Sequence, residues 1–371
     1  MSTNIHESPL MSLFLELLQV SLGTRGELSR VPSAHEWEQL LIKAEDQAIV
    51  GLLLSGLERL PEEQLPPLEV KLQWIGEFQI EEATYRQHLK VIAKTRDCLK
   101  KGGVKAAFMK GLVCGSRYPQ PERRTCGDID FVVAEKDFVK TLDLLEDIGT
   151  VDRELIHEHH GMAFVDDVTL EPHYKVHNFQ NPAVDEAMKE MFAEVFPDRL
   201  EIVDIEGEKV PVFPAAFECA VLVGHMVNHV YAEGLGLRQV VDFYYWLKVN
   251  CEREVIWGYL RSMRMERAFR VFACICENYL GLDSALLGMS YTYKEKRFAQ
   301  KMMEDVLRVG NFAHSIDYTG NNEVLRPLRS YFWVVGRCIK LGYLCPAEAR
   351  WWPVSKVRRF FWKKAEKKRL E

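Results

Sequence analysis

The chain lacks the sequence patterns that mark several common protein classes. Its nine cysteines include no Cys-x-x-Cys pair, which excludes common zinc-finger spacings, and their odd number argues against a disulfide framework. Glu218 and His225 interrupt the most apolar stretch, residues 213–227, so no run reaches the roughly 18 apolar residues of a transmembrane helix. No basic segment precedes the first apolar stretch, which argues against a signal peptide. We therefore expect a cytoplasmic protein with reduced cysteines.

Positive charge is scarce in the main body of the chain and concentrated near its end. The formal net charge is −6, although residues 350–369 contain nine lysines and arginines and one acidic residue. A general nucleic-acid binder would instead carry a basic face on its main body. The basic tail also contains Trp351, Trp352 and Trp362, so it could contact an anionic surface, such as lipid, RNA or an acidic partner. The alternative is a terminal helix whose aromatic residues pack on the body.

Hydrophobic periodicity divides the chain into three regions. Residues 1–101 and 214–371 contain apolar residues at helical spacing, and the second region ends in the basic aromatic tail. Residues 102–213 contain short apolar or alternating runs, which predict strands, together with helices at 134–148 and 182–197. The predicted strands cover residues 104–109, 128–133, 159–165 and 169–176, with two shorter strands around a turn at 206–208. The pattern predicts an α+β protein, in which two helical regions flank a core with a small mixed sheet.

Two acidic residues share one predicted strand in the segment Gly127-Asp128-Ile129-Asp130. Residues two apart on a strand point to the same side, so Asp128 and Asp130 face one way while Ile129 faces the core. Like charges this close repel each other, and a divalent cation offsets the repulsion. A third acidic residue, Glu171, lies on a later predicted strand. Carboxylate oxygens suit Mg²⁺ or Mn²⁺, so we predict that these three residues hold the metal and form a catalytic site.

Residues near the first predicted strand could bind the phosphates of a nucleotide. Gly111 would let the backbone approach a phosphate closely, and the short helix after it would direct N–H groups at the anion. Lys110 and Arg124 could pair with phosphate oxygens. His173 lies on the same strand face as Glu171, where it could act as a base or orient the nucleotide.

These residues resemble the polymerase-beta-like nucleotidyltransferase superfamily, whose members have a glycine turn, two aspartates spaced as above and a third acid on a later strand. More narrowly, the chain resembles a bacterial group of uncharacterised nucleotidyltransferase family proteins, over residues 30–250 approximately. The resemblance rests on Lys110-Gly111, Arg124, the segment 127–130, Glu171-Pro172-His173, and His225 with Asp242. It implies a nucleotidyltransferase core that transfers a nucleoside monophosphate from an NTP, such as ATP, to an acceptor and releases pyrophosphate. The acceptor is left open among small molecules, proteins and RNA.

Two features depart from the superfamily pattern. The usual Gly-Ser or Gly-Gly turn is replaced by Lys110-Gly111-Leu112, so the hydroxyl group that would hold the triphosphate is expected from another residue, such as Ser116. Pro172 follows Glu171 and cannot donate a backbone hydrogen bond, which predicts an edge strand or a bulge at this position.

Several polar residues outside these motifs are candidates for substrate contacts. His225 and His229 lie four residues apart on a predicted helix, a spacing that suits a metal pair, a hydrogen bond in the core or a contact to substrate. Arg238 and Asp242 have the same spacing and could form a structural ion pair or reach the substrate. Residues 157–160 contain three histidines, which we expect on a solvated hairpin edge, although one of them could serve as a base.

Two other functions fit the sequence. A degenerate nucleotidyltransferase fold could bind a nucleotide without catalysis, and the altered turn and Pro172 favour this alternative. An interaction module of the toxin–antitoxin type would depend on the acidic body and the basic tail rather than on a pocket. The carboxylate pattern disfavours this last alternative.

Overall fold

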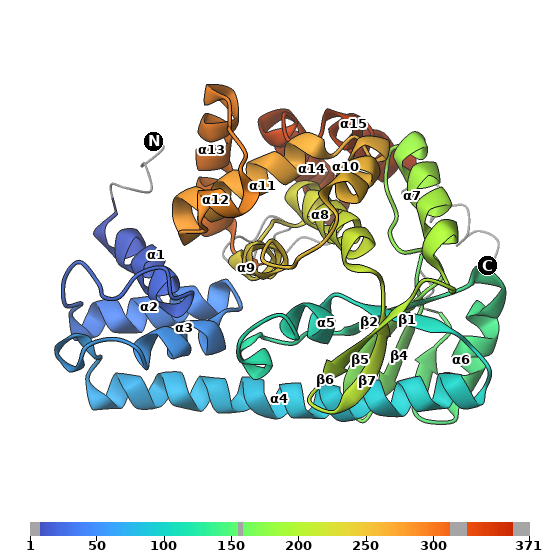
Figure 1. Ribbon diagram of the computed structural model, residues 1–371, viewed down its shortest axis with the longest axis horizontal. Helices are drawn as coiled ribbons and strands as arrows, with labels where there is room; N and C mark the ends of the chain where they lie inside the picture. The colour runs from blue at the N-terminus through green and yellow to red at the C-terminus, as the bar shows by residue number, and fades with distance from the viewer. Residues whose placement is uncertain (1–7, 155–158, 312–324, 359–371) are drawn as a thin grey trace.

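The computed structural model describes residues 8–154, 159–311 and 325–358, and the chain has the predicted α+β architecture. The sheet lies between the long helix α4 (Leu68–Lys101) on one side and the C-terminal helices on the other (Figure 1). Helices α1 (Pro9–Ser21), α2 (Ala34–Asp46) and α3 (Val50–Leu57) lie at one end of the molecule. All strands of the sheet fall within residues 106–212.

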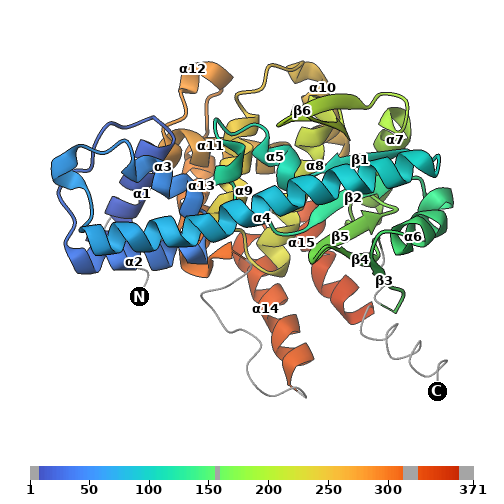
Figure 2. The same cartoon turned by 90° about the horizontal axis from the view of Figure 1, so that it is seen from below.

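Four helices form the N-terminal region. Ser33 begins α2 through a capping box, because its side chain accepts a hydrogen bond from Glu36 N while the Glu36 carboxylate accepts one from Ser33 N. Helix α4 is 34 residues long and crosses most of the molecule beneath the sheet (Figure 2). Its first half packs in the N-terminal core and its second half packs under the sheet, so it joins the two regions. The helices are α1 (Pro9–Ser21), α2 (Ala34–Asp46), α3 (Val50–Leu57) and α4 (Leu68–Lys101).

The core of the protein is a mixed seven-stranded sheet in the order β3-β4-β5-β2-β1-β7-β6. Strands β2 and β5 run parallel, as do β1 and β7, and the other neighbours run antiparallel. The strands are β1 (Ala106–Met109), β2 (Ile129–Val133), β3 (Thr150–Asp152), β4 (Met162–Val165), β5 (Val168–His173), β6 (Glu201–Ile205) and β7 (Glu208–Val212). The helices between them are α5 (Gly111–Gly115), α6 (Phe138–Glu146) and α7 (Pro182–Val195).

The side chains of β2 alternate between two apolar cores. Ile129, Phe131 and Val133 pack with residues of α4 and α6, whereas Val132 packs in the larger core that includes the C-terminal helices. Because alternate residues of a strand share a side, Asp130 faces the same way as Val132. The sheet therefore presents Asp130 toward the C-terminal helices.

The C-terminal region consists of helices packed over this face of the sheet. Among the C-terminal helices, α8 (Ala215–Ala232) and α9 (Leu237–Trp246) are drawn nearest the sheet (Figure 1), and α9 contacts α5. In the part of the chain that the structure describes, no helix is long and apolar enough to cross a membrane. The helices are α8 (Ala215–Ala232), α9 (Leu237–Trp246), α10 (Arg253–Ser262), α11 (Glu266–Leu280), α12 (Ser284–Leu287), α13 (Tyr293–Val309), α14 (Arg326–Leu341) and α15 (Pro346–Ala349).

Two strands differ from the sequence prediction. Strand β3 was not predicted, because its three residues are half-buried or exposed and give no apolar alternation. The prediction that Pro172 marks an edge strand was wrong, since β5 lies between β4 and β2. Gly161 N donates to Pro172 O at 2.9 Å, and His160 pairs with His173 beyond it, so the proline removes one donor without ending the pairing.

Candidate active site

The parallel pairing of β2 with β5 brings two of the predicted catalytic carboxylates together. Asp130 is the direct neighbour of Glu171 in this pairing, and Asp128 immediately precedes β2. Asp130 is 4% exposed, and Asp128 and Glu171 are half-buried. The structure thus gathers all three carboxylates around the start of β2.

Asp130 is the best-partnered of the three carboxylates. Its Oδ1 accepts hydrogen bonds from Lys110 Nζ at 2.7 Å and from His173 Nε2 at 2.8 Å. The same His173 nitrogen lies 3.6 Å from Glu171 Oε2. Lys110 and His173, both predicted to bind nucleotide, therefore contact the carboxylates directly.

The surroundings of Asp128 and Asp130 shift the pKa values of these two residues in opposite directions. Repulsion from Asp130, together with burial and the charge of Glu171, raises the pKa of Asp128 to about 6. Burial would also raise the pKa of Asp130, but Lys110 and His173 outweigh it and hold that pKa well below its usual range. The ionised form of Asp128 is therefore unfavourable beside the other two carboxylates, and a bound cation would offset this repulsion.

The Lys110-Gly111 turn has a backbone conformation that explains its glycine. Lys110 and Gly111 have φ values of +55° and +33°, in the left-handed region that side chains with a Cβ rarely adopt. A Cβ on Gly111 would also lie 3.2 Å from the carbonyl oxygen of Asp128. Helix α5 begins at Gly111, so its first N–H groups, which have no partner within the helix, start beside the carboxylates.

A cavity of about 280 Å³ lies between the carboxylates and the helices above them. The turn and the sheet line one side with Lys110, Gly111, Asp128, Asp130, Glu171 and His173. Helices α8 and α9 line the other side with Leu222, His225, Asn228, His229, Arg238, Gln239 and Asp242. The four residues predicted as substrate contacts, His225, His229, Arg238 and Asp242, are therefore all brought to the cavity.

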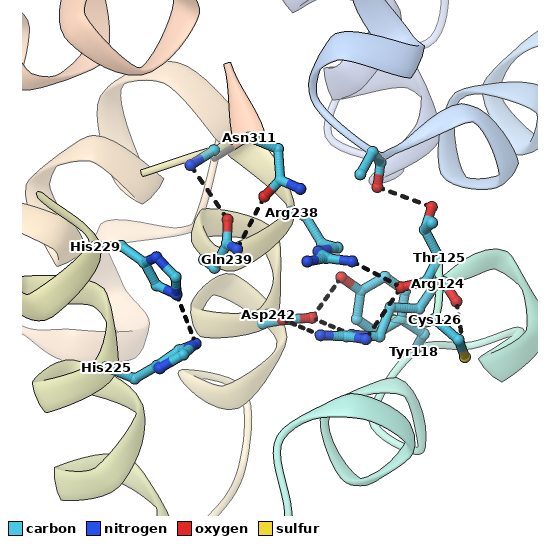
Figure 3. Close-up of polar contacts among 12 residues, drawn as sticks. Tyr118, Arg124, Thr125, Cys126, His225, His229, Arg238, Gln239, Asp242 and Asn311 are labelled. Carbon is cyan, nitrogen blue, oxygen red and sulfur yellow. Dashed lines mark hydrogen bonds and ion pairs between the residues drawn. The ribbon is translucent and has the colours of Figure 1, made fainter. Parts of the chain in front are cut away.

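Arg124 lines the cavity, but its guanidinium group is already paired. Its Nε and Nη2 donate to the two carboxylate oxygens of Asp242 at 2.9 and 2.8 Å, and Tyr118 Oη donates to the same carboxylate at 2.9 Å (Figure 3). Arg124 is 7% exposed and Asp242 is 3% exposed. The expected local pair between Arg238 and Asp242 is thus replaced by a buried pair that ties the loop before β2 to α9.

Arg238 also lines the cavity, and it is not part of the buried pair with Asp242. Its Nη1 donates to Thr125 O at 3.3 Å, and its side chain lines the cavity near Gly127 (Figure 3). Thr125 Oγ1 in turn lies within hydrogen-bonding distance of Ala48 O, at 2.9 Å, and of Glu81 Oε1, at 2.7 Å. Contacts from three separate elements therefore fix the loop that carries Asp128.

Ser116, the suggested source of a phosphate-binding hydroxyl, is turned elsewhere. Its Oγ donates to Val113 O at 2.7 Å at the end of α5. Among the described residues that line the cavity, Ser116 does not occur.

Histidines are unusually dense around the cavity. His225 and His229 contact each other through their Nε2 atoms at 2.9 Å, which requires one ring to donate and the other to accept (Figure 3). Burial lowers the pKa of His229 to about 3 and that of His225 well below its usual range, so both rings are neutral at pH 7. His177 also lines the cavity and was missed by sequence analysis. Its alternation with Glu171 and His173 was the signal that could have revealed it.

The histidines expected on a solvated hairpin edge lie instead beside the carboxylates. His157 lies outside the described residues, but His159 and His160 are half-buried, and their ring centroids lie 5.4 and 5.0 Å from that of His173. His160 Nε2 is 3.9 Å from Glu171 Oε1.

The donor atoms of the site fit a divalent cation. One atom each from Asp130, Glu171 and His173 lie within 4.8 Å of one another. Carboxylate oxygens are the ligands that Mg²⁺ and Mn²⁺ take, together with phosphate oxygens and water. Repulsion from Asp130, burial and the charge of Glu171 raise the pKa of Asp128, and a bound cation would offset this repulsion.

Comparison with known proteins places the chain in a family. Comparison with curated proteins finds no match. Among solved structures, the chain is similar to an antigenic nucleotidyltransferase-like protein from Paracoccidioides brasiliensis, at 14% identity and a TM-score of 0.33, over 54% of this chain and 96% of that one. The family model described as uncharacterised nucleotidyltransferase matches residues 33–281, well over half of the chain. The chain therefore belongs to this uncharacterised nucleotidyltransferase family.

Proposed function

We propose that the protein transfers a nucleoside monophosphate from an NTP to an acceptor and releases pyrophosphate. The observation that carries the proposal is the pairing of β2 with β5, which gathers Asp128, Asp130 and Glu171 at the wall of a cavity that also contains Lys110 and Arg238. Clustered carboxylates beside half-buried cations suit a reaction in which a metal-bound polyphosphate is held for attack.

Asp128, Asp130 and Glu171 would hold Mg²⁺ or Mn²⁺. When bound, the ion would neutralise charge on the triphosphate and on the leaving pyrophosphate. Lys110 donates to Asp130 in the described structure, and it could donate to a phosphate oxygen from the same place, since an ammonium group has three donors.

Arg238 and Lys110 would bind the triphosphate from opposite sides of the cavity. Arg238 replaces Arg124 in this proposal, because the donors of Arg124 that face Asp242 are used in the buried pair. The neutral pair His225 and His229 would contact the nucleoside or the acceptor through hydrogen bonds rather than charge.

The proposed step replaces one phosphorus–oxygen bond by another. A nucleophilic oxygen of the acceptor forms a bond to the α-phosphorus of the NTP, and the bond from that phosphorus to the bridging oxygen breaks. Pyrophosphate leaves with the bonding electron pair. The proton of the acceptor passes to Glu171 and from there to water.

A second candidate function is nucleotide binding without transfer. The observation in its favour is that Lys110 Nζ and His173 Nε2 both already bind Asp130 Oδ1, so an internal cation partly takes the place of a metal. Under this alternative the protein binds NTP in a manner that needs no divalent cation.

The test compares labels at two positions of the nucleotide. The full chain is incubated with Mg²⁺, a cell extract as the source of acceptors, and ATP or another NTP labelled at the α- or γ-phosphorus. Nucleotidyl transfer predicts acceptor labelling from the α-position alone, with loss in Glu171→Gln and no loss in Asp143→Asn, a matched change in an exposed ion pair. Labelling from the γ-position, or equal labelling by Glu171→Gln, would contradict the proposal. Absence of any labelling with retained, metal-independent NTP binding would favour the second candidate.

A further inference from the structure

Three histidines gather at the end of the β4–β5 hairpin, beside the carboxylates. One ring nitrogen from each of His159, His160 and His173 lies within 4.8 Å of the other two. Neutral imidazole nitrogen is the preferred ligand of zinc and related transition metals, whereas Mg²⁺ prefers oxygen. The nitrogen donors and the carboxylate donors therefore form two adjacent groups, and His173 belongs to both.

The backbone holds these histidines in place. His160 and His173 are directly opposed across the antiparallel pairing of the hairpin, which puts their side chains on the same side of the sheet. Tyr174 N donates to His159 O at 3.0 Å, and Gly161 N donates to Pro172 O at 2.9 Å. The ligand positions are thus fixed by main-chain contacts on either side of His160.

His173 has the arrangement of a metal-binding histidine with a supporting carboxylate. Its Nε2 lies 2.8 Å from Asp130 Oδ1, so the proton belongs on Nε2 and the lone pair on Nδ1. Within the described residues, the buried Nδ1 atoms of His173 and His159 have no hydrogen-bond partner. A bound ion would supply the missing contact to both of these nitrogens.

We propose that His159, His160 and His173 bind a divalent transition-metal ion that favours nitrogen ligands, such as Zn²⁺ or Co²⁺, at a site that adjoins the carboxylate group. Three nitrogens bound tetrahedrally at about 2.0–2.1 Å from zinc stand roughly 3.4 Å apart. The three nitrogens, which lie within 4.8 Å of one another, would close to that separation around an ion through rotation of the rings. The fourth position is left for water or for the Glu171 carboxylate, whose Oε1 lies 3.9 Å from His160 Nε2. This inference goes beyond the proposed transfer reaction and does not depend on it.

The test uses Co²⁺ as a visible probe and Zn²⁺ as its competitor. The metal-free full chain is titrated with Co²⁺ in excess Mg²⁺, while visible absorption is recorded, and Zn²⁺ affinity is measured by calorimetry. We expect one ion per chain, with Zn²⁺ displacing Co²⁺. Affinity should fall in His159→Gln and in His160→Gln by more than the roughly 10- to 100-fold that loss of an outer-shell partner costs, and each variant is checked for folding by circular dichroism.

Two control variants locate the ion. His35→Gln, at an exposed histidine of α2, should leave the Co²⁺ spectrum unchanged, as should Asp128→Asn, which removes a carboxylate but no histidine. Unchanged Co²⁺ affinity in both folded His159 and His160 variants would overturn the proposal. Equal loss in Asp128→Asn and His159→Gln would place the ion among the carboxylates and would also overturn it. Neither result would bear on NTP binding, which is measured separately.

Discussion

Replacing Asp128 by asparagine should stabilise the metal-free protein while it removes a metal ligand. The ionised Asp128 is unfavourable in the folded chain because Asp130, burial and Glu171 raise its pKa from 3.8 to about 6. A shift of this size corresponds to about 3 kcal/mol at pH 7, since one pKa unit is about 1.4 kcal/mol. For a chain of this length, that free energy corresponds to an increase in Tm of roughly 4 °C.

The sign of this effect follows from proton linkage. A carboxyl group whose folded-state pKa is raised destabilises the fold progressively as pH rises from 3.8 to about 6, and fully above that. Asparagine keeps the shape and removes the charge. The Asp128→Asn variant should therefore be more stable than the native chain at pH 7, and this difference in stability should disappear near about pH 4.

The matched control is the same change two residues away. Asp130→Asn should destabilise the chain by up to about 3–5 kcal/mol, because it leaves Lys110 buried beside a weaker partner. Thermal unfolding of both variants in a chelator, and again in Mg²⁺, measures the two effects. Mg²⁺ should raise the Tm of the native chain and should have much less effect on Asp128→Asn. A lower Tm for Asp128→Asn than for the native chain in chelator would refute the reasoning.

Three further predictions concern stability and are checked by chemical or thermal unfolding. Asp242→Asn should cost about 3–5 kcal/mol, because it breaks a buried ion pair, whereas Asp143→Asn in an exposed pair should cost less than about 1 kcal/mol; equal losses would contradict the account. Burial raises the pKa of Glu348 to about 7, so the free energy of unfolding should fall by about 3 kcal/mol between about pH 4.5 and 7. Glu348→Gln should flatten this part of the plot of unfolding free energy against pH. Parallel plots for the native chain and the variant would show that this carboxyl group does not titrate there. Gly111→Ala should destabilise by more than about 1 kcal/mol, because of its positive φ, whereas Gly76→Ala within α4 should stabilise by about 0.5–1 kcal/mol; a neutral Gly111→Ala would contradict the strained turn.

Local pattern in the sequence was enough to find the strands that carry the carboxylates. The alternation around Asp128 and Asp130 predicted β2, and the alternation around Glu171 predicted β5, because each strand buries one set of side chains and presents the other. Gly111 was expected in a turn that lets the backbone approach a phosphate, and its positive φ agrees with the turn. The metal and nucleotide roles of these residues stay predictions.

Contacts between distant parts of the chain could not be predicted in this way. Arg124 and Asp242 are 118 residues apart, and no local signal indicates that they form a bidentate pair. The proline after Glu171 suggested an edge strand. Residues on either side of this proline nevertheless continue the pairing of β5 with the segment before β4. The local sequence predicts that His159 is solvated, whereas in the folded chain it is half-buried and lines the cavity. Tertiary packing therefore decides which polar residues reach the cavity.

The most direct test of the central claim is the binding of nucleoside triphosphates by calorimetry, with Mg²⁺ and with a chelator. The native full chain and the variant Asp128→Ala/Asp130→Ala are titrated with each NTP, after circular dichroism has shown that both are folded. The account predicts binding that requires Mg²⁺ and is lost in the double variant. Failure of the folded native chain to bind any NTP in Mg²⁺, or binding that the double variant retains, would contradict it.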